Sequence, residues 1–411
     1  MRSFPLLVLL LLRVGFLAFA LLPFGACAPA ARTQLAAAPA ASSALSATGP
    51  AVDVIHHDVE LSLRLAPPSL AGKGEVRVRA RRPTSVITLD ARALQIAQVA
   101  TASGSLAFRQ SGDRLDIDLR EPLAAGAELG LMLAWQVSTT GKMPRFSADQ
   151  VWAGYRASAW MPTIQDPAQR ATLALRITAP AELKVAAVGR ATESAPTSGG
   201  LTAHTFVLDH PSPPFLYAFA AGHFDEAELA VDDVTLRALG PSGSDLKGAL
   251  AVTAPMVRFL RSRTGVPFPS STYVQVFVHG DDVAQEGAGL SLLSEDALAD
   301  IQKDPTDDWI FSHELSHQWF GWLVPSADFS DFWLNEGFAT FSVAAVKEQR
   351  WGHRAYQSEI DIWHQRSSKV HADGRDAPIS LSAPGAMAKT PPSESELQPR
   401  GVTYFRGALV L

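Results

Sequence analysis

The pattern of hydrophobic and polar positions divides the chain into a leading apolar run, a strand-rich part and a part of mixed pattern. From residue 52 to about residue 222, apolar and polar positions alternate with a period of two, and Gly, Pro and Asp separate the runs. We expect strands at residues 59–65, 74–80, 115–119, 173–177 and 215–221. No helical stretch of useful length interrupts them, so this part is predicted to be an all-β sandwich.

The pattern changes after about residue 223. Residues 246–263 have a helical period although Pro255 lies among them, whereas residues 273–279 and 289–293 are typical of strands. Helix signals then continue from Pro305 to Arg350. The sequence therefore predicts a multidomain α+β protein, with an N-terminal β-sandwich at residues 51–222 and a second domain at residues 223–411.

The first 50 residues carry targeting signals. In residues 1–27, Arg2 is followed by an apolar run that is typical of an export signal. The run ends at Gly25-Ala26 before Cys27, the only cysteine, and this ending resembles a bacterial lipoprotein processing site. Conventional cleavage near Cys27 and an uncleaved anchor are the alternatives, since the run is nearly long enough to span a bilayer. Residues 28–50 are rich in Ala and Pro, which indicates a flexible tether. We expect export in a bacterium and a lipid anchor on the periplasmic side of the membrane.

Length, charge and cysteine content narrow the function. The 411 residues are enough for two or three domains. The net charge of −6 provides no electrostatic basis for nucleic-acid binding, so we expect no nucleic-acid partner. A single cysteine excludes an internal disulfide framework and any metal site built from several cysteines. Any metal must therefore be held by histidines and carboxylates.

Residues 313–317 read His-Glu-Leu-Ser-His. Two histidines four positions apart on a helix lie one above the other, and Asp304-Pro305 and Gly321 predict the start and the end of that helix. Neutral imidazole nitrogens are good zinc ligands, and a catalytic zinc has a third protein ligand and an open position. Glu314 is rotated by about 100° from the first histidine, so it does not share the ligand role but can reach a zinc-bound water.

The third ligand must come from another segment. Residues 333–338 read Trp-Leu-Asn-Glu-Gly-Phe and open a further helix, and eighteen residues separate His317 from Glu336. This combination resembles the gluzincin zinc aminopeptidases, the membrane alanyl aminopeptidase family that also contains leukotriene hydrolase. The resemblance implies a thermolysin-like catalytic domain at residues 223–411 and one zinc ion per chain, held by His313, His317 and Glu336.

The same resemblance implies the catalytic roles. Glu314 is expected to take a proton from the zinc-activated water and pass it to the leaving amine. Residues 404–408 read Tyr-Phe-Arg-Gly-Ala, and Tyr404 is expected to donate a hydrogen bond to the oxyanion of the transition state. Glu286 is expected to bind the free ammonium of the substrate. The predicted function is therefore a zinc-dependent aminopeptidase that hydrolyses N-terminal residues from peptides.

Two single positions and one short string differ from the pattern of the family. Trp322 stands where members usually have Asn, and Val343 stands where they often have a Glu that supports the metal ligands. The amine-recognition string, Gly-x-Met-Glu-Asn in the family, reads Val-Ala-Gln-Glu-Gly at residues 283–287. For Glu286, a solvated loop carboxylate is the alternative to an amine-binding group.

Two other functional classes remain open. One is a zinc endopeptidase, or another zinc hydrolase, without a requirement for a free amine. The other is a non-enzymatic surface protein with a structural zinc ion, although such a site has no use for a carboxylate like Glu314 at an open position. The apolar stretch at residues 402–411 has no helix cap or polar tail, which predicts that a C-terminal helical domain is missing. The sequence predicts neither the oligomeric state nor the preferred side chain of the substrate.

Overall fold

The computed structural model describes residues 49–281, 283–374, 376, 378–379 and 401–411, of which residues 50–411 form one compact unit. The expected export signal, Cys27 and nearly all of the tether lie outside the described residues, so the lipid anchor stays a prediction. None of the helices described here is long and apolar enough to cross a membrane.

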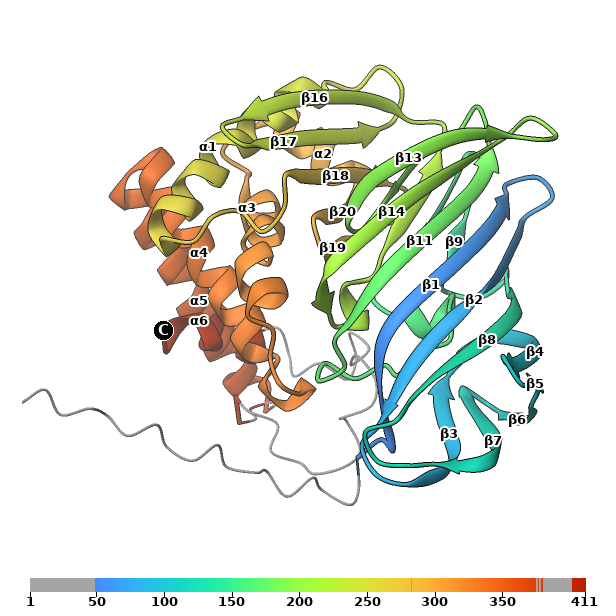
Figure 1. The fold of residues 1–411 in the computed structure, drawn as a ribbon. Coiled ribbons are helices and arrows are strands. Elements are labelled where there is room, and N and C mark those ends of the chain that lie inside the picture. Colours follow the sequence, from blue (N-terminus) through green and yellow to red (C-terminus); the bar gives the residue numbers. More distant parts are fainter. Residues whose placement is uncertain (1–48, 282, 375, 377, 380–400) are drawn as a thin grey trace, which may run out of the picture. The chain divides into compact units, whose positions relative to one another are not determined.

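The part of this unit up to Gly222 consists of β-sheets (Figure 1). An eight-stranded sheet has the order β13-β14-β11-β1-β2-β8-β4-β5. Its strands are β13 (Arg190–Thr197), β14 (Leu201–Ser212), β11 (Ala171–Pro180), β1 (Val52–Arg64), β2 (Ser69–Ala80), β8 (Glu128–Val137), β4 (Leu94–Thr101) and β5 (Gly104–Ser105). Neighbouring strands are antiparallel except for β1 and β11, which are parallel.

Two smaller sheets pack against the eight-stranded sheet. One contains β12 (Lys184–Ala187), β15 (Phe219–Gly222), β10 (Gln150–Ala153) and β9 (Arg145–Phe146). The other contains β3 (Thr84–Asp90), β7 (Arg114–Leu123) and β6 (Ala107–Ser111). Leu61 of β1, Ile87 of β3, Ile117 of β7 and Phe219 of β15 are fully buried members of one hydrophobic cluster. A shared apolar core between sheets is the defining feature of a sandwich, so the predicted fold class of this domain is confirmed.

One predicted strand is partly wrong. Residues 215–221 alternate in the sequence, but the first of them belong to a 3-10 turn, Pro214–Leu216, and the strand begins only at Phe219. Pro213 and Pro214 supply no N–H groups, so the chain here cannot continue a hydrogen-bonded ladder.

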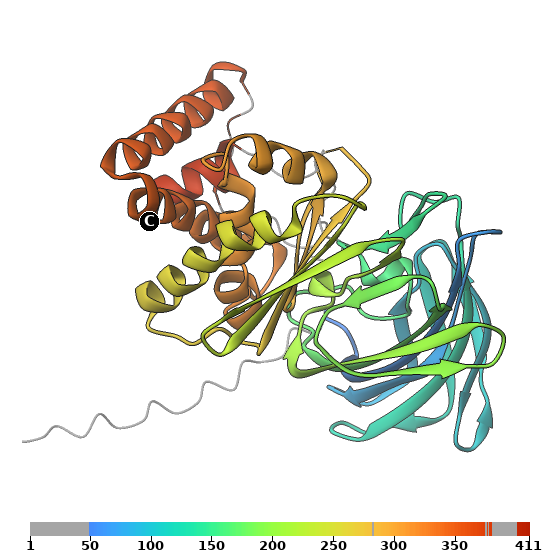
Figure 2. The ribbon, with the colours of Figure 1, turned by 90° about the horizontal axis from the view of Figure 1, so that it is seen from above.

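The second half is mixed, as predicted. A five-stranded sheet has the order β16-β17-β18-β20-β19, and β19 is an antiparallel edge strand beside β20. Its strands are β16 (Asp225–Val231), β17 (Val234–Gly240), β18 (Thr272–Val278), β20 (Leu290–Ser294) and β19 (Ala284–Gly287). The helices are α1 (Leu246–Thr264), α2 (Glu295–Lys303), α3 (Trp309–Ser316), α4 (Trp333–Trp351), α5 (His353–Ala372) and the short α6 (Gly407–Leu409). Helix α4 lies next to both α3 and α5 (Figures 1 and 2).

The start of α3 differs from the prediction. Asp304 and Pro305 do not begin this helix, because Asp304 closes α2 and its carboxylate accepts hydrogen bonds from the backbone and the hydroxyl of Thr306. The helix begins at Trp309 after Asp308. The carboxylate of Asp308 is buried and accepts hydrogen bonds from Arg350 and Trp351, which ties the start of α3 to the end of α4.

His279 joins the β-domain to the second domain. Its ring nitrogens lie 3.0 Å from a carboxylate oxygen of Asp149 and 2.8 Å from one of Glu295. The buried Gln150 accepts a hydrogen bond from the His279 amide and donates one to Glu295. Burial opposes charging of His279, but the hydrogen bonds and negative charges of Asp149 and Glu295 outweigh it and raise the pKa of His279. His279 therefore belongs to this junction and is not a candidate ligand.

This ion-pair cluster predicts a pH-dependent contribution to stability. Because the pKa of His279 is higher in the folded than in the unfolded state, its contribution is complete below the unfolded value of ~6.5 and is lost as the pH rises through the folded value. We expect His279→Gln to lower the free energy of unfolding more at pH 5.5 than at pH 8.5. The groups are half-exposed, so the pH-dependent part should stay below about 1 kcal/mol. Urea unfolding measures it, with the exposed His364→Gln as the matched control. An equal loss at both pH values would contradict the prediction.

Candidate active site

The end of α3, the residue that follows it and the first turn of α4 bring together the two histidines and Glu336. The Nε2 atom of His313 lies 3.1 Å from Nε2 of His317 and 3.1 Å from Oε2 of Glu336, and the third distance, from His317 to Glu336, is 3.7 Å. A tetrahedral ion with bonds of ~2.0–2.1 Å requires donor atoms about 3.3 Å apart. The three observed distances bracket this value, and all three side chains are buried. Two imidazoles and one carboxylate in this arrangement fit a catalytic zinc site.

His317 is held in the tautomer that a metal ligand needs. Its Nδ1–H donates a hydrogen bond to the carbonyl oxygen of Phe320 at 2.9 Å. The proton is therefore on Nδ1, and Nε2 carries the lone pair that can bind a metal. Burial lowers the pKa of His317 to about 4, so the ring is neutral near pH 7. The backbone reaches this position because helix α3 ends at Ser316 and the chain then turns sharply. Gly321 has a φ of 136°, a conformation that L side chains rarely adopt.

The start of α4 positions Glu336. The helix begins at Trp333, so Glu336 lies in its first turn and its amide donates a hydrogen bond to the carbonyl of Phe332. The preceding residue, the buried Asn335, accepts a hydrogen bond from the Ser326 amide and so anchors the loop before α4. Hydrogen bonds of the fold thus hold the backbone that carries Glu336.

Glu314 lies beside these donors but faces a second group of side chains. A carboxylate oxygen of Glu314, one of Glu286 and a ring nitrogen of His317 all lie within 4.8 Å of one another. Glu314 is buried, like all residues of α3 from Phe311 to Ser316. The Glu314 carboxylate therefore lies next to one of the three donors, within reach of a group that binds between His317 and Glu286.

Glu286 is not a solvated loop carboxylate, so that alternative is wrong. It belongs to the edge strand β19, and only 8% of its surface is exposed. The side-chain amide of Gln285 donates to the backbone carbonyl of Glu286 at 2.6 Å and to its carboxylate at 3.2 Å. Burial, and then the negative charge of Glu336, raise the pKa of Glu286 well above its ordinary value. No basic side chain among the described residues forms an ion pair with it, so a cationic ligand would relieve this cost.

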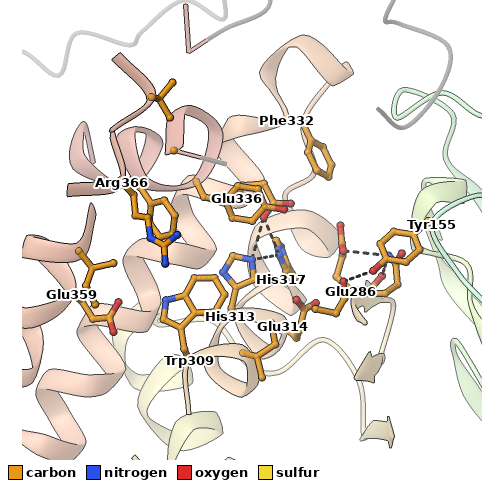
Figure 3. Close-up of a pocket in the computed structure, with 18 of the residues that line it drawn as sticks. Tyr155, Glu286, Trp309, His313, Glu314, His317, Phe332, Glu336, Glu359 and Arg366 are labelled. Carbon is orange, nitrogen blue, oxygen red and sulfur yellow. Dashed lines mark hydrogen bonds and ion pairs between the residues drawn. The ribbon is translucent and has the colours of Figure 1, made fainter. Parts of the chain in front are cut away.

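Tyr404 lines the same cavity from the last segment of the chain. Its ring lies 5.6 Å from that of His313 and nearly parallel to it. The helical turn that carries it, Gly401–Arg406, continues into α6, which packs on α4. A Cβ atom added to Gly337 would lie 3.0 Å from the backbone of Gly407, so glycines on both sides permit this close approach. The structure therefore brings all six predicted site residues into one cavity (Figure 3).

The structure also shows lining residues that the sequence did not single out. The indole of Trp309 stacks on the His313 ring at 4.5 Å, one helical turn before it. Tyr155 reaches the cavity from the β-domain, and its hydroxyl donates a hydrogen bond to the carbonyl of Ala284 on β19. The four-residue spacing of Trp309 and His313 in the sequence indicated that their side chains could stack on a helix. Nothing in the sequence around Tyr155 indicated its hydrogen bond to Ala284.

The structure shows that Trp322 and Val343, the two other differences from the family pattern, are both buried. Trp322 is buried, and its indole N–H donates a hydrogen bond to the Ser212 hydroxyl of the β-domain at 2.8 Å. Val343 is fully buried in α4. Both positions therefore serve packing within this chain.

Comparison with known proteins found a matching family model and similar aminopeptidases. Residues 248–411 match the family described as peptidase family M1 domain. Aminopeptidase N of Bos taurus is 26% identical over 393 aligned residues, which cover 83% of this chain and 39% of that protein. Aminopeptidase N of Acetobacter pasteurianus is 23% identical over 314 residues, which cover 70% of this chain and 88% of that protein.

A solved structure has the same fold. The M1 zinc metallopeptidase from Deinococcus radiodurans superposes with a TM-score of 0.69 at 25% sequence identity, covering 87% of this chain and 81% of that chain. This chain spans 27% and 39% of the length of the aminopeptidases N from Oryctolagus cuniculus and Bos taurus. The similarity to these long relatives thus concerns one part of each.

The geometry predicts how single substitutions affect metal content. We expect His317→Ala to lose bound zinc, because two of the three donors do not hold the ion at a catalytic site. Glu314→Gln should retain it, since Glu314 lies beside the three donors and is not one of them. Atomic emission after extensive dialysis measures the zinc-to-protein ratio of each variant and of the wild type. Full zinc content in His317→Ala, or its loss in Glu314→Gln, would show that the donor set is different.

Proposed function

We propose that this protein is a zinc-dependent aminopeptidase that hydrolyses N-terminal residues from peptides, a proposal supported by the match of residues 248–411 to the peptidase family M1 domain. The observation that carries the proposal is the buried carboxylate of Glu286 beside Glu314 and the three metal donors. A free amino terminus is the cation that such a carboxylate can bind within a peptide-sized cavity of about 780 Å³. We propose one zinc ion per chain, held by His313, His317 and Glu336.

The residues of the chain divide the chemistry among them. When bound, zinc supplies a Lewis acid that polarises a carbonyl and lowers the pKa of water. Glu314 accepts the proton of the attacking water and returns it to the leaving amine. Glu314 can do so because its buried carboxylate lies beside the donors without being one of them.

Glu286 and Tyr404 orient the substrate. A carboxylate oxygen of Glu286 lies within 4.8 Å of one of Glu314, so an ammonium held by Glu286 leaves room for one residue before the scissile bond. Binding at one end thus sets the position of cleavage. The Tyr404 phenol lines the cavity beside His313, and it donates a hydrogen bond as negative charge develops on the carbonyl oxygen.

The requirement for a free amine can be tested directly. We expect the wild type to hydrolyse a short peptide with a free N-terminus and to leave the N-acetylated peptide intact, because acetylation removes the positive charge that Glu286 binds. Glu286→Ala should raise KM for the free peptide and lower kcat by ~10-fold or more through lost positioning, with unchanged zinc content. Chromatography of the products over time measures the hydrolysis rates of the free and the N-acetylated peptide. Equal cleavage of both peptides by the wild type would favour the endopeptidase alternative.

The role of Tyr404 predicts a different kinetic signature. Tyr404→Phe removes a hydrogen bond that is made mainly in the transition state, so kcat should fall ~10²–10³-fold with little change in KM. Steady-state kinetics with a free-amine peptide measures the two parameters. Glu314→Gln, with nearly all turnover lost, provides the reference for an inactive enzyme. A loss of less than about threefold in Tyr404→Phe would remove Tyr404 from the mechanism.

A further inference from the structure

The cavity continues beyond the metal donors along one face of α5. Glu359, Ile362, Arg366 and Lys369 line it, and their spacing of three to four residues places them on the same side of the helix. Figure 3 shows Glu359 and Arg366 on the side of His313 opposite Glu286. The two ends of the cavity therefore lie on either side of the metal donors.

Three basic residues line the end of the cavity formed by α4 and α5. Arg366 is the one among them that has no carboxylate partner in the described part of the chain. Among the basic residues that line the cavity, Lys347 donates to Glu359 at 2.5 Å, and Lys369 forms an ion pair with Asp373 at 3.1 Å. No ion pair or hydrogen bond engages the guanidinium of Arg366 within the described residues. Its charge is therefore available to a ligand.

The proposed function predicts how a peptide substrate is oriented in the cavity. If the ammonium of the substrate lies at Glu286 and the scissile bond at the metal donors, the leaving part of the peptide extends toward α5. Trp309 and Ile362 add apolar surface to the lining of the cavity, and Arg366 lines it as well. A guanidinium presents paired N–H groups that match the two oxygens of a carboxylate.

We propose that Arg366 binds a carboxylate in the leaving part of the substrate, so that short peptides are the preferred substrate class. The inference rests on the proposed aminopeptidase function. The carboxylate comes either from the C-terminus of a dipeptide or tripeptide or from an acidic side chain after the scissile bond. The cavity of about 780 Å³ has the size of a small-ligand site, which fits a short peptide with a charge at each end.

Three substrates separate these sources: alanyl-phenylalanine, its C-terminal amide, and alanyl-glutamate amide. We expect the wild type to cleave the free acid with a kcat/KM about tenfold above that of its amide, the range for a charge-assisted hydrogen bond at an exposed position. Arg366→Gln should remove this difference by slowing the free acid alone. A preference for the glutamate amide over the phenylalanine amide that also depends on Arg366 would assign the carboxylate to a side chain.

The matched control is Arg354→Gln, since Arg354 is an exposed arginine of α5 that does not line the cavity. It should leave all three rates unchanged. Equal kcat/KM for acid and amide, without a glutamate preference, would overturn the inference, as would an unchanged preference in Arg366→Gln. Neither result would affect the proposed function, because amide cleavage would continue.

Calorimetry makes the test independent of turnover. In the Glu314→Gln background, alanyl-phenylalanine should bind about tenfold more tightly than its amide, and adding Arg366→Gln should abolish the difference. If no free-amine peptide is cleaved by the wild type, the proposed function fails, and these two dissociation constants still decide the inference. Equal affinities for acid and amide in the presence of Arg366 would refute it.

Discussion

Three buried carboxylates share one cavity, and the electrostatic cost of that arrangement governs the site. Glu286, Glu314 and Glu336 are each more than nine-tenths buried, and Glu336 is near enough to help raise the pKa of Glu286. Uncompensated charges of one sign in a poorly solvated site are strongly unfavourable. One divalent cation and one ammonium balance three carboxylates. The proposed metal ion and the proposed substrate thus supply the positive charges that the fold itself does not provide.

The backbone that holds these groups is interrupted between α3 and α4. Helix α3 ends at Ser316, so the turn through Phe320 and Gly321 can place a carbonyl on the far nitrogen of His317. Helix α4 then begins close enough for Glu336 to reach both histidines. A continuous helix through this region would have satisfied its own carbonyls and left His317 without that partner. The break therefore contributes to the geometry of the proposed metal site.

The β-domain contributes to the site as well as to stability. Tyr155 holds the edge strand that carries Glu286, since its hydroxyl donates to the carbonyl of Ala284. The Trp322 indole and the His279 cluster connect the same two parts of the chain at other points. Because an edge strand has one unpaired side, it needs such contacts to keep a fixed position. The β-domain thereby helps to define where a substrate amine would lie.

The sequence determined the local geometry of this protein. Strand alternation and helical periodicity predicted the two-part α+β fold, and the spacing of residues 313–317 predicted two converging imidazoles, because helix geometry alone sets those distances. The spaced Glu336 led to a family resemblance that the match of residues 248–411 confirms. The tertiary structure decided the rest: the true start of α3, the burial of Glu286, the approach of Tyr155 and the lone charge of Arg366. These features depend on which side chains from distant segments meet. Such meetings are set by the packing of whole elements, which no local periodicity encodes.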